Sequence, residues 1–255
     1  LKKRPMRPLF DVLTAVGAKI TYLEQEGFLP IRIVGAGTGK EMAQLDLDIS
    51  SSTQFLSAML LVSPMMKQGL VIHITSEKTD GSYIRITRKM MENFGAEVSF
   101  DGRDYEVAAG TSYQAGEYQI EPDVSAACYF YAAAAILGGS ALVKNVTNAC
   151  MQGDLKFLTV LEKMGCRIEE TEAGIRVTGP ESGRLKGIQV PMNDFSDQAL
   201  TLAAIAPFAD SDVRMEGIGH IRLQECDRLH AMATELQRLG ITCEEEVDAI
   251  TIHPG

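Results

Sequence analysis

Four stretches of the chain carry apolar residues at helical spacing and end in a glycine. They are FDVLTAVGAKI, RKMMENFGAEV, LTVLEKMGCRI and ATELQRLGITC, with the glycines Gly17, Gly95, Gly165 and Gly240. In the third stretch, Leu158, Leu161 and Met164 form one apolar stripe. A glycine just after such a stripe is typical of a helix end that leads into a strand. The pattern predicts four amphipathic helices at the surface.

A second series of helical segments is apolar on every side. These segments are SSTQFLSAMLLV from Ser51, SAACYFYAAAAIL from Ser125 and SDQALTLAAIAPFA from Ser196. Helices without a polar face are expected to be buried all round, and a leading serine is a strong N-cap. If the three N-termini gather, their free N–H groups and dipoles form a site for anionic ligands. Capping alone is the alternative interpretation of each serine.

Short β-prone runs separate the helices. They are Ile31–Val34, Leu70–Thr75, Ala141–Val146 and Asp212–Glu216. The four glycines recur at intervals of roughly 70 to 80 residues, which is longer than the usual solenoid unit. Each repeat is therefore expected to be a small fold, with the order strand, helix, strand, buried helix, strands. This alternation predicts an α/β architecture rather than a helix bundle or a sandwich.

The composition predicts a globular protein that does not bind polyanions. With 255 residues, 45% of them hydrophobic, the chain can form one large or two small domains. Its formal charge of -10 disfavours binding to nucleic acid or to an anionic membrane. The longest apolar run, Phe55–Met65, is interrupted by polar residues and a proline, and the start Leu1–Pro5 lacks a signal-peptide core. We expect a cytoplasmic protein without a nucleic-acid or membrane partner.

Cysteine and histidine usage gives no sign of a metal site. The five cysteines, Cys128, Cys150, Cys166, Cys226 and Cys243, lack C-x-x-C spacing and fall in helix-like or strand-like patterns, so we expect buried, reduced thiols. Four scattered histidines offer no ligand spacing. The segment Gly35–Lys40 superficially resembles a nucleotide-binding loop but fits neither spacing, so we predict a turn. No metal or organic cofactor is expected.

Ordered motifs along the whole chain resemble one enzyme family. Ser52-Thr53-Gln54-Phe55-Leu56 is similar to the Ser-Ser-Gln motif of the enolpyruvylshikimate phosphate synthase family, and Leu223-Gln224-Glu225-Cys226-Asp227-Arg228-Leu229 to its Lys-Glu-Ser/Thr-Asp-Arg-Leu motif. Further matches in the right order are Lys3-Arg4-Pro5-Met6, Tyr83-Ile84-Arg85-Ile86-Thr87, Tyr118-Gln119-Ile120-Glu121-Pro122-Asp123, Met151-Gln152-Gly153-Asp154, Asn193 and Asp197.

The resemblance implies a two-domain fold, of which this chain holds an internal part. Each domain of the family has three βαβαββ units around buried parallel helices, and the ligands bind in the cleft between the domains. By this resemblance, residues 1–121 belong to the first domain, residues 122–255 to the second, and the crossover lies near residues 119–124. Both ends of the sequence look cut, because the family's first and last motifs have no counterpart here. We therefore expect the 255-residue chain alone to be inactive.

The resemblance also implies a reaction of aromatic amino acid biosynthesis. The family adds the 5-hydroxyl of shikimate 3-phosphate to the enol carbon of phosphoenolpyruvate and then eliminates phosphate. Asp197 and Glu225 match its two carboxylates, which act as acid and base in turn, with Asp197 as the base for the hydroxyl. The alternative interpretations are a helix-start charge for Asp197 and a solvated charged face for Glu225.

Substrate recognition is expected to depend on arginines and short polar side chains. Arg4 and Arg228 match the arginines with which the family binds phosphoenolpyruvate. Arginine suits this role because a guanidinium binds a carboxylate or phosphate with two parallel hydrogen bonds. Ser52, Thr53 and Gln54 match the residues that hold the shikimate phosphate at a helix N-terminus, where Gln54 touches both ligands. For Arg4, an ordinary surface arginine is the alternative interpretation.

Three positions depart from the family pattern on the side of the shikimate phosphate. Asp80 stands where the family has Ser, and its carboxylate would repel a phosphate unless Thr79 or Ser82 takes that place. Gln224 replaces a Lys and can still donate a hydrogen bond, while His220 replaces an Asn and gains charge below neutral pH. These changes keep the reaction class but bear on the acceptor substrate.

Two other functions are compatible with the same fold. One is the sister transferase that modifies a UDP-linked amino sugar. That enzyme needs a Cys as proton donor, a role for which none of the five cysteines is placed. The other is a binding protein that kept the fold and lost the chemistry. We expect an enolpyruvyl transferase that acts as a monomer, with phosphoenolpyruvate and shikimate 3-phosphate as its small-molecule substrates.

Overall fold

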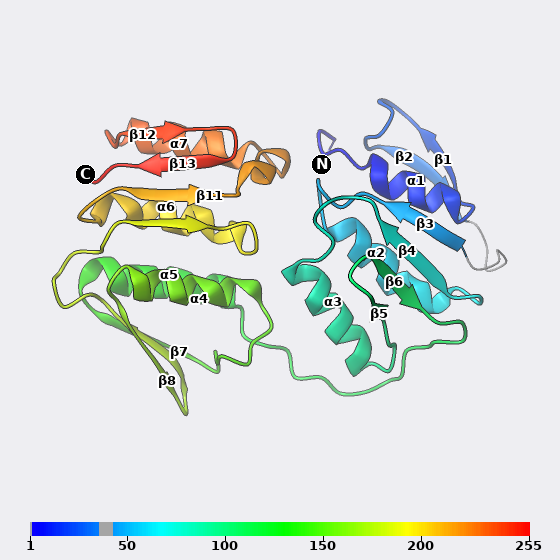
Figure 1. Ribbon diagram of the computed structural model, residues 1–255, viewed down its shortest axis with the longest axis horizontal. Coiled ribbons are helices and arrows are strands. Elements are labelled where there is room, and N and C mark those ends of the chain that lie inside the picture. Colours follow the sequence, from blue (N-terminus) through cyan, green and yellow to red (C-terminus); the bar gives the residue numbers. More distant parts are fainter. Residues whose placement is uncertain (1, 36–42) are drawn as a thin grey trace. The chain divides into compact units, whose positions relative to one another are not determined.

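The chain forms two compact units that each have their own hydrophobic core. The computed structural model describes residues 2–35 and 43–255, so most of the predicted turn at Gly35–Lys40 lies outside the described residues. Backbone contacts divide the chain into Leu1–Tyr118, called unit 1, and Gln119–Gly255, called unit 2 (Figure 1).

Unit 1 contains one complete repeat of strand, helix, strand, helix and two strands. Its sheet has the order β3-β4-β6-β5, in which β3 and β4 run parallel and the other pairs are antiparallel. The parallel pair requires a crossover connection, which α2 supplies. The repeat consists of β3 (Ala43–Leu47), α2 (Gln54–Val62), β4 (Leu70–Ile74), α3 (Ser82–Asn93), β5 (Ser99–Phe100) and β6 (Asp104–Val107). It is preceded by α1 (Arg7–Ala15) and the hairpin of β1 (Lys19–Tyr22) and β2 (Ile31–Val34), and η1 (Ser63–Met65) extends α2.

Unit 2 contains a second complete repeat with the same strand order, β10-β11-β13-β12. It consists of β10 (Ile188–Pro191), η3 (Ser196–Gln198), α6 (Ala199–Ile205), η4 (Ala206–Phe208), β11 (Val213–Glu216), η5 (Gly219–Leu223), α7 (Arg228–Arg238), β12 (Cys243–Glu245) and β13 (Ala249–Ile252).

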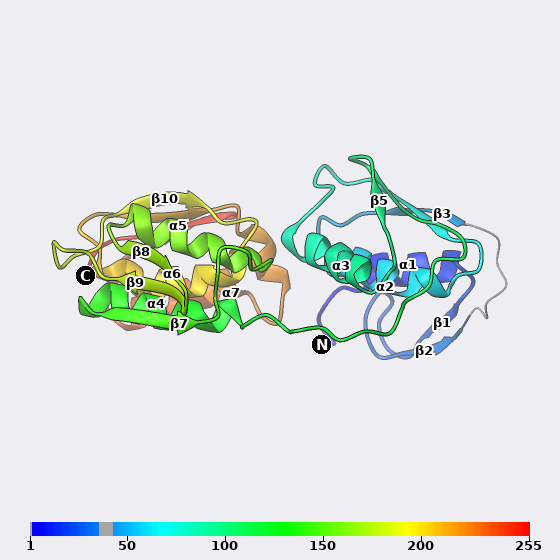
Figure 2. The same cartoon turned by 90° about the horizontal axis from the view of Figure 1, so that it is seen from below.

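The first half of unit 2 forms a smaller sheet with the order β7-β9-β8, on which α4 packs (Figure 2). Its elements are α4 (Val124–Leu137), β7 (Ser140–Lys144), η2 (Gly153–Leu155), α5 (Lys156–Lys163), β8 (Arg167–Thr171) and β9 (Gly174–Thr178).

The predicted α/β architecture of repeated βαβαββ units is confirmed. The four amphipathic stretches form α1, α3, α5 and α7, and their terminal glycines all have positive φ. The four predicted strands correspond to β2, β4, β7 and β11. The predicted order within a repeat was wrong in one respect, because the two-stranded hairpin follows the amphipathic helix and a single strand follows the apolar one.

The apolar helices are not buried all round, contrary to the prediction. On α4, Tyr131 is fully buried, but its neighbours Tyr129 and Phe130 are 62% and 63% exposed, and Leu137 is 79% exposed. The helix packs on β7 and β9 with one side and on α6 with another, which leaves a third face uncovered within unit 2. The extra apolar residues therefore lie on the part of α4 that stays largely exposed in unit 2.

The predicted serine caps were wrong for all three apolar helices, since the N-cap of α2 is Thr53 rather than a serine. The N-cap of α4 is Asp123, whose carboxylate accepts a hydrogen bond from the Ala126 N–H at 2.9 Å. The residue at the N-cap of η3 is Phe195, and the Ser196 hydroxyl contacts His220 instead. A carboxylate caps a helix as well as a hydroxyl does, so Ser125 is available for a contact with Asp154.

The expectation of buried cysteines holds for part of the set. All five cysteines are free thiols; Cys128, Cys166 and Cys243 are buried, and Cys150 is half-buried. Cys226 is exposed, because it lies between η5 and α7 in a charged segment rather than in a helix or strand. In the part of the chain that the structure describes, no helix combines the length and apolar character needed to cross a membrane.

Candidate active site

The predicted phosphate-binding residues of unit 1 lie at the start of α2. Thr53 is the N-cap, with helical backbone angles, and in the described chain its side chain makes no capping hydrogen bond. The hydroxyl of Ser52 accepts a hydrogen bond from the Gln54 N–H at 3.3 Å. The first N–H groups of a helix have no intrahelical partner and lie at the positive end of its dipole. The start of α2 is therefore suited to an anion.

Arg4 joins these residues from the segment before α1. Its Nη2 donates a hydrogen bond to Oε1 of Gln54 at 3.0 Å. Arg4 is half-buried and Gln54 is exposed. Four of the predicted binding residues, Arg4, Ser52, Thr53 and Gln54, thus gather at one end of α2, with a guanidinium beside the helix N-terminus.

The start of α3 lies directly beside the start of α2. Gly81 is the N-cap of α3, and a Cβ atom at this position would lie 3.3 Å from the Thr53 side-chain methyl carbon. The same point is 3.9 Å from the Lys78 ammonium nitrogen. The absence of a side chain at Gly81 permits this close approach. Two helix N-termini and one ammonium group are therefore adjacent in unit 1.

Asp80, the departure from the family pattern in this unit, is neutralised by an arginine. Its Oδ2 pairs with Arg85 Nη1 at 2.7 Å, and its Oδ1 accepts a hydrogen bond from the Tyr105 hydroxyl at 3.3 Å. Tyr105 also donates to the carbonyl of Thr79, and burial, reinforced by the nearby Asp80 charge, raises its pKa. Tyr105 therefore stays a neutral donor, and the negative charge of Asp80 is shared with Arg85.

In unit 2 the structure brings three predicted residues together, with Asp197 and Glu225 on either side of Arg228, the first residue of α7. Its Nη1 donates to Oδ1 of Asp197 at 2.9 Å, and its Nη2 pairs with the Glu225 carboxylate. Asp197 lies in η3 at the start of α6, and Glu225 lies in the segment before α7. One guanidinium thus bridges two carboxylates that come from different elements.

The charge state of this cluster is strongly favoured. Burial lowers the pKa of Arg228, but the hydrogen bond and charge of Glu225, together with Asp197, outweigh it and leave the pKa raised. Arg228 therefore stays cationic across the physiological range. A fork of this kind can exchange one carboxylate partner for an anionic ligand while keeping the other.

His220 and Gln224 lie on the same stretch of chain as Glu225. The Nε2 atom of His220 lies 2.8 Å from the hydroxyl of Ser196, so His220 also contacts the start of η3. Within residues 2–35 and 43–255, the Oε1 atom of Gln224 is shielded from solvent and has no hydrogen-bond partner. A buried amide oxygen without a partner is costly, so this side chain is suited to a polar ligand.

Sequence reasoning missed a buried carboxylate that organises unit 2. Asp154 is only 6% exposed, and it accepts hydrogen bonds from the Ser125 hydroxyl and from Gln198 Nε2, the latter at 3.0 Å. Gln198 in turn accepts from the Thr201 hydroxyl. Asp154 therefore links the start of α4 to the turn that carries Asp197. Burial raises its pKa against these hydrogen bonds.

One signal in the sequence could have pointed to this cluster. Asp154 precedes an apolar helical stretch, while Ser125 and Gln198 each stand in a helix that is otherwise nearly apolar. Polar residues in such helices need partners, because buried polar groups are normally hydrogen-bonded. In the described ranges, no three His, Cys, Asp or Glu side chains are arranged to hold a metal ion.

Comparison with known proteins identifies the family. The family model for EPSP synthase (3-phosphoshikimate 1-carboxyvinyltransferase) matches residues 1–255. The chain is 40% identical to a 3-phosphoshikimate 1-carboxyvinyltransferase from Nostoc punctiforme and covers 59% of it; for that of Escherichia coli (strain SMS-3-5 / SECEC) the values are 42% and 58%. In each case the whole chain is aligned.

A solved structure of EPSP synthase from Acinetobacter baumannii matches with a TM-score of 0.74 at 26% identity, over all of this chain and 57% of that one. The chain therefore spans a little under three fifths of the length of these relatives. Family model, sequence relatives and fold agree: the chain belongs to the EPSP synthase (3-phosphoshikimate 1-carboxyvinyltransferase) family.

Proposed function

We propose that the protein with this chain transfers the enolpyruvyl group of phosphoenolpyruvate to the 5-hydroxyl of shikimate 3-phosphate and releases phosphate. One observation carries the proposal: Arg228 holds the carboxylates of Asp197 and Glu225 around a single guanidinium. The reaction needs a base, an acid and a cation that grips an anionic substrate. These three groups are adjacent in unit 2, and the relatives named above have this activity in their names.

Proton transfer in the proposed reaction is assigned to the two carboxylates. Asp197 accepts the proton of the 5-hydroxyl as its oxygen bonds to the enol carbon, and Glu225 delivers a proton to the methylene carbon. In the second step, the carbon–oxygen bond to phosphate breaks, Glu225 takes back a proton from the methyl group, and the departing phosphate takes up the proton that Asp197 had accepted. Positioned acids and bases of this kind contribute about 10² to 10⁴ in rate. The roles of Asp197 and Glu225 can be tested separately by substitution.

Substrate binding is assigned to both units. The start of α2, with Ser52, Thr53 and Gln54, would hold the phosphate of shikimate 3-phosphate through hydroxyls and helix N–H groups. Arg4 and Arg228 would bind phosphoenolpyruvate, because each can form two parallel bonds to an anion. The Arg85 contact supports this assignment, since a paired Asp80 repels a phosphate less than a free carboxylate would.

His220 and Gln224 are proposed to contact the acceptor substrate. A Gln side chain can present its NH₂ or its oxygen at the shielded position, because the two ends of the amide have nearly the same shape. Gln224 can thus donate to a substrate oxygen without the charge of the family's Lys. Nε2 of His220 contacts Ser196, and the other ring nitrogen, Nδ1, can donate a hydrogen bond to the acceptor substrate.

The proposal extends to the setting of the enzyme. We propose a monomer in the cytoplasm that uses phosphoenolpyruvate and shikimate 3-phosphate without a metal or organic cofactor. We also propose that the domain division lies near residues 121–122. The net charge of -10 supports the absence of a nucleic-acid or anionic-membrane partner. Sedimentation of the purified protein would test the monomer.

The decisive experiment measures phosphate release. The chain would be expressed with flanking segments that restore the length of its relatives, and supplied with phosphoenolpyruvate and shikimate 3-phosphate. We expect turnover from that protein and none from the 255 residues alone. A parallel assay with UDP-N-acetylglucosamine as acceptor should give no release. Lack of turnover by the extended protein, or preference for the UDP sugar, would contradict the proposal.

A further inference from the structure

The proposed acid and substrate-binding residues of unit 2 lie on an irregular segment. His220, Gln224 and Glu225 fall in η5 and the residues that follow it, and Arg228 opens α7. Such a segment has no ladder of backbone hydrogen bonds to fix it, unlike a strand or a long helix. Side chains placed on it need support from elsewhere, because catalytic geometry tolerates little displacement.

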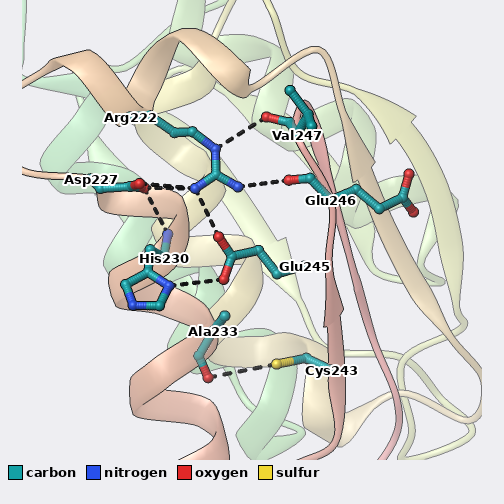
Figure 3. Close-up of polar contacts among 8 residues, drawn as sticks. All are labelled: Arg222, Asp227, His230, Ala233, Cys243, Glu245, Glu246 and Val247. Atoms are coloured by element: carbon teal, nitrogen blue, oxygen red, sulfur yellow. Dashed lines mark hydrogen bonds and ion pairs between the residues drawn. The ribbon is translucent and has the colours of Figure 1, made fainter.

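Arg222 supplies that support from within the segment (Figure 3). Its Nε donates to the carbonyl of Val247 at 3.1 Å, and its Nη2 donates to the carbonyl of Glu246 at 2.7 Å. Its Nη1 donates to both carboxylate oxygens of Asp227, at 3.0 and 2.9 Å, and lies 2.7 Å from Oε1 of Glu245. Every nitrogen of the guanidinium is therefore bonded to the β12–β13 hairpin or to Asp227.

The contacts around Arg222 close into a ring that includes the start of α7. Asp227 caps this helix by accepting from the His230 N–H at 2.9 Å. The second oxygen of Glu245 lies 3.0 Å from Nδ1 of His230. The other end of the segment is tied to the same hairpin, where the carbonyl of Asp248 accepts from the Ile218 N–H at 3.2 Å. Both ends of the irregular segment are thus held by one hairpin.

We propose that Arg222 is a positioning residue that sets the places of Glu225 and Arg228 by tying residues 219–227 to the β12–β13 hairpin. Its effect on turnover rests on the proposed function, whereas its effect on the order of the segment does not. Burial opposes the charged forms of Arg222, Asp227 and Glu245. Their mutual contacts outweigh it, so the pKa of Arg222 is raised and the pKa values of both acids are lowered. Arg222, Asp227 and Glu245 are therefore ionised throughout the physiological range.

Arg214 on β11 offers a matched control. It pairs with Glu216 at 2.8 Å, and its Nη2 donates to the Glu246 carboxylate at 3.1 Å. Its Nη1 donates to the Thr251 hydroxyl at 2.9 Å. Arg214 thus anchors the same hairpin through an equally large set of contacts, but the described contacts do not reach residues 219–227. Loss of Arg214 should weaken the hairpin without releasing the segment.

The test compares Arg222→Ala and Arg214→Ala. Hydrogen–deuterium exchange of the 255-residue chain should be at least tenfold faster in residues 219–227 of Arg222→Ala, and within twofold of wild type there in Arg214→Ala. In the enzyme extended to the length of its relatives, Arg222→Ala should lower kcat by 10- to 100-fold at a temperature where all variants are folded, against less than threefold for Arg214→Ala. Arg222→Lys should recover only part of that loss, because one ammonium cannot replace the forked contacts.

The outcomes separate the inference from the proposed function. If the wild-type enzyme shows no turnover, the proposed function fails, and the exchange experiment still decides the role of Arg222. Equal exchange in both alanine variants, or equal kcat with an active wild type, would overturn the inference. If Arg222→Ala does not fold, Glu245→Gln removes one partner of the ring more gently. It should then accelerate exchange in residues 219–227 at least threefold, and wild-type exchange there would count against the proposal.

Discussion

The two complete repeats have the same strand order but different chemistry at matching places. The apolar helix of the unit 1 repeat begins with Ser52-Thr53-Gln54, and that of the unit 2 repeat begins with Ser196-Asp197-Gln198. The surroundings differ as well, since Gln54 is exposed and bonded to Arg4, whereas Gln198 is 1% exposed and bonded to Asp154. One scaffold thus presents neutral donors in one unit and a carboxylate in the other.

A second matching place is the start of the amphipathic helix. In unit 1, Asp80 pairs with Arg85 of α3, so one carboxylate is matched by one guanidinium. In unit 2, Arg228 of α7 pairs with both Asp197 and Glu225. The unit 2 cluster therefore has two carboxylates and only one guanidinium. A surplus of carboxylates suits proton transfer, and a balanced pair beside helix N-termini suits anion binding.

The sharpest way to break this comparison is to remove the acid that distinguishes the unit 2 repeat. Asp197→Asn in the extended enzyme should lower kcat by roughly 10³-fold, because the amide cannot accept the hydroxyl proton. The shape and one hydrogen bond to Arg228 are retained. Steady-state phosphate release would measure the loss, and Asp212→Asn, which removes the exposed partner of His253, should stay within twofold of wild type. Activity of Asp197→Asn above a tenth of wild type would refute the base assignment.

The next test makes the unit 1 repeat resemble the unit 2 repeat. Thr53→Asp puts a carboxylate where the phosphate is proposed to bind, and like charges in contact cost several kcal/mol. We expect the KM for shikimate 3-phosphate to rise by roughly 100-fold, with a much smaller change in the KM for phosphoenolpyruvate. Thr53→Ser keeps the hydroxyl and should behave as wild type. An unchanged KM in Thr53→Asp would remove the start of α2 from the phosphate site.

Periodicity and turn residues predicted much of the fold from the sequence. Gly17 and Gly240 follow amphipathic helices, and the predicted strand Leu70–Thr75 forms β4 (Leu70–Ile74), because these features depend on local sequence. The family motifs supplied the candidate site residues, and the structure brings Asp197, Glu225 and Arg228 together. Their roles in turnover stay predictions.

Features that depend on distant partners were not predictable. Ser125 was expected to cap α4, but it donates to Asp154, which lies 29 residues further along the chain. The uncovered face at Phe130 likewise depends on which elements pack around α4. No role for Arg222 was predicted from the sequence, although its neighbours Gln224 and Glu225 were predicted site residues. Its partners at residues 245–247 are distant in the sequence and meet it only in the folded chain. Local patterns carry no record of such contacts.

A smaller effect is expected from the ion pair in unit 1. Arg85→Ala would leave Asp80 without its guanidinium, and we expect the KM for shikimate 3-phosphate to rise about tenfold, since roughly 1.4 kcal/mol changes an equilibrium tenfold. Asp80→Ser removes the carboxylate and should lower that KM by about two- to threefold. The double variant should resemble Asp80→Ser, because Arg85 then has no acid to neutralise. A double variant as weak as Arg85→Ala would mean that Arg85 binds the substrate directly.

The smallest expected effect concerns the buried carboxylate that unit 2 has and the start of α2 lacks. Burial raises the pKa of Asp154 in the folded state above its ordinary value of 3.8. The folded chain therefore holds this proton more tightly than the unfolded chain. The corresponding stabilisation is complete below pH 3.8 and is lost as the pH rises through the folded-state pKa.

Asp154→Asn removes this titration while keeping an oxygen that can accept from Gln198 or Ser125. We expect the free energy of unfolding at pH 8 to stay equal or to rise by up to about 1 kcal/mol, since loss of a buried charge offsets the lost bond. At pH 3.5 the variant should lose that advantage. Asp154→Ala should cost about 2 kcal/mol, because two donors lose their acceptor. Urea titrations of the 255-residue chain across this pH range would measure the free energy of unfolding of both variants. Asp11→Asn, at an exposed aspartate in unit 1, is the control variant. A pH dependence unchanged in Asp154→Asn would show that another group titrates there.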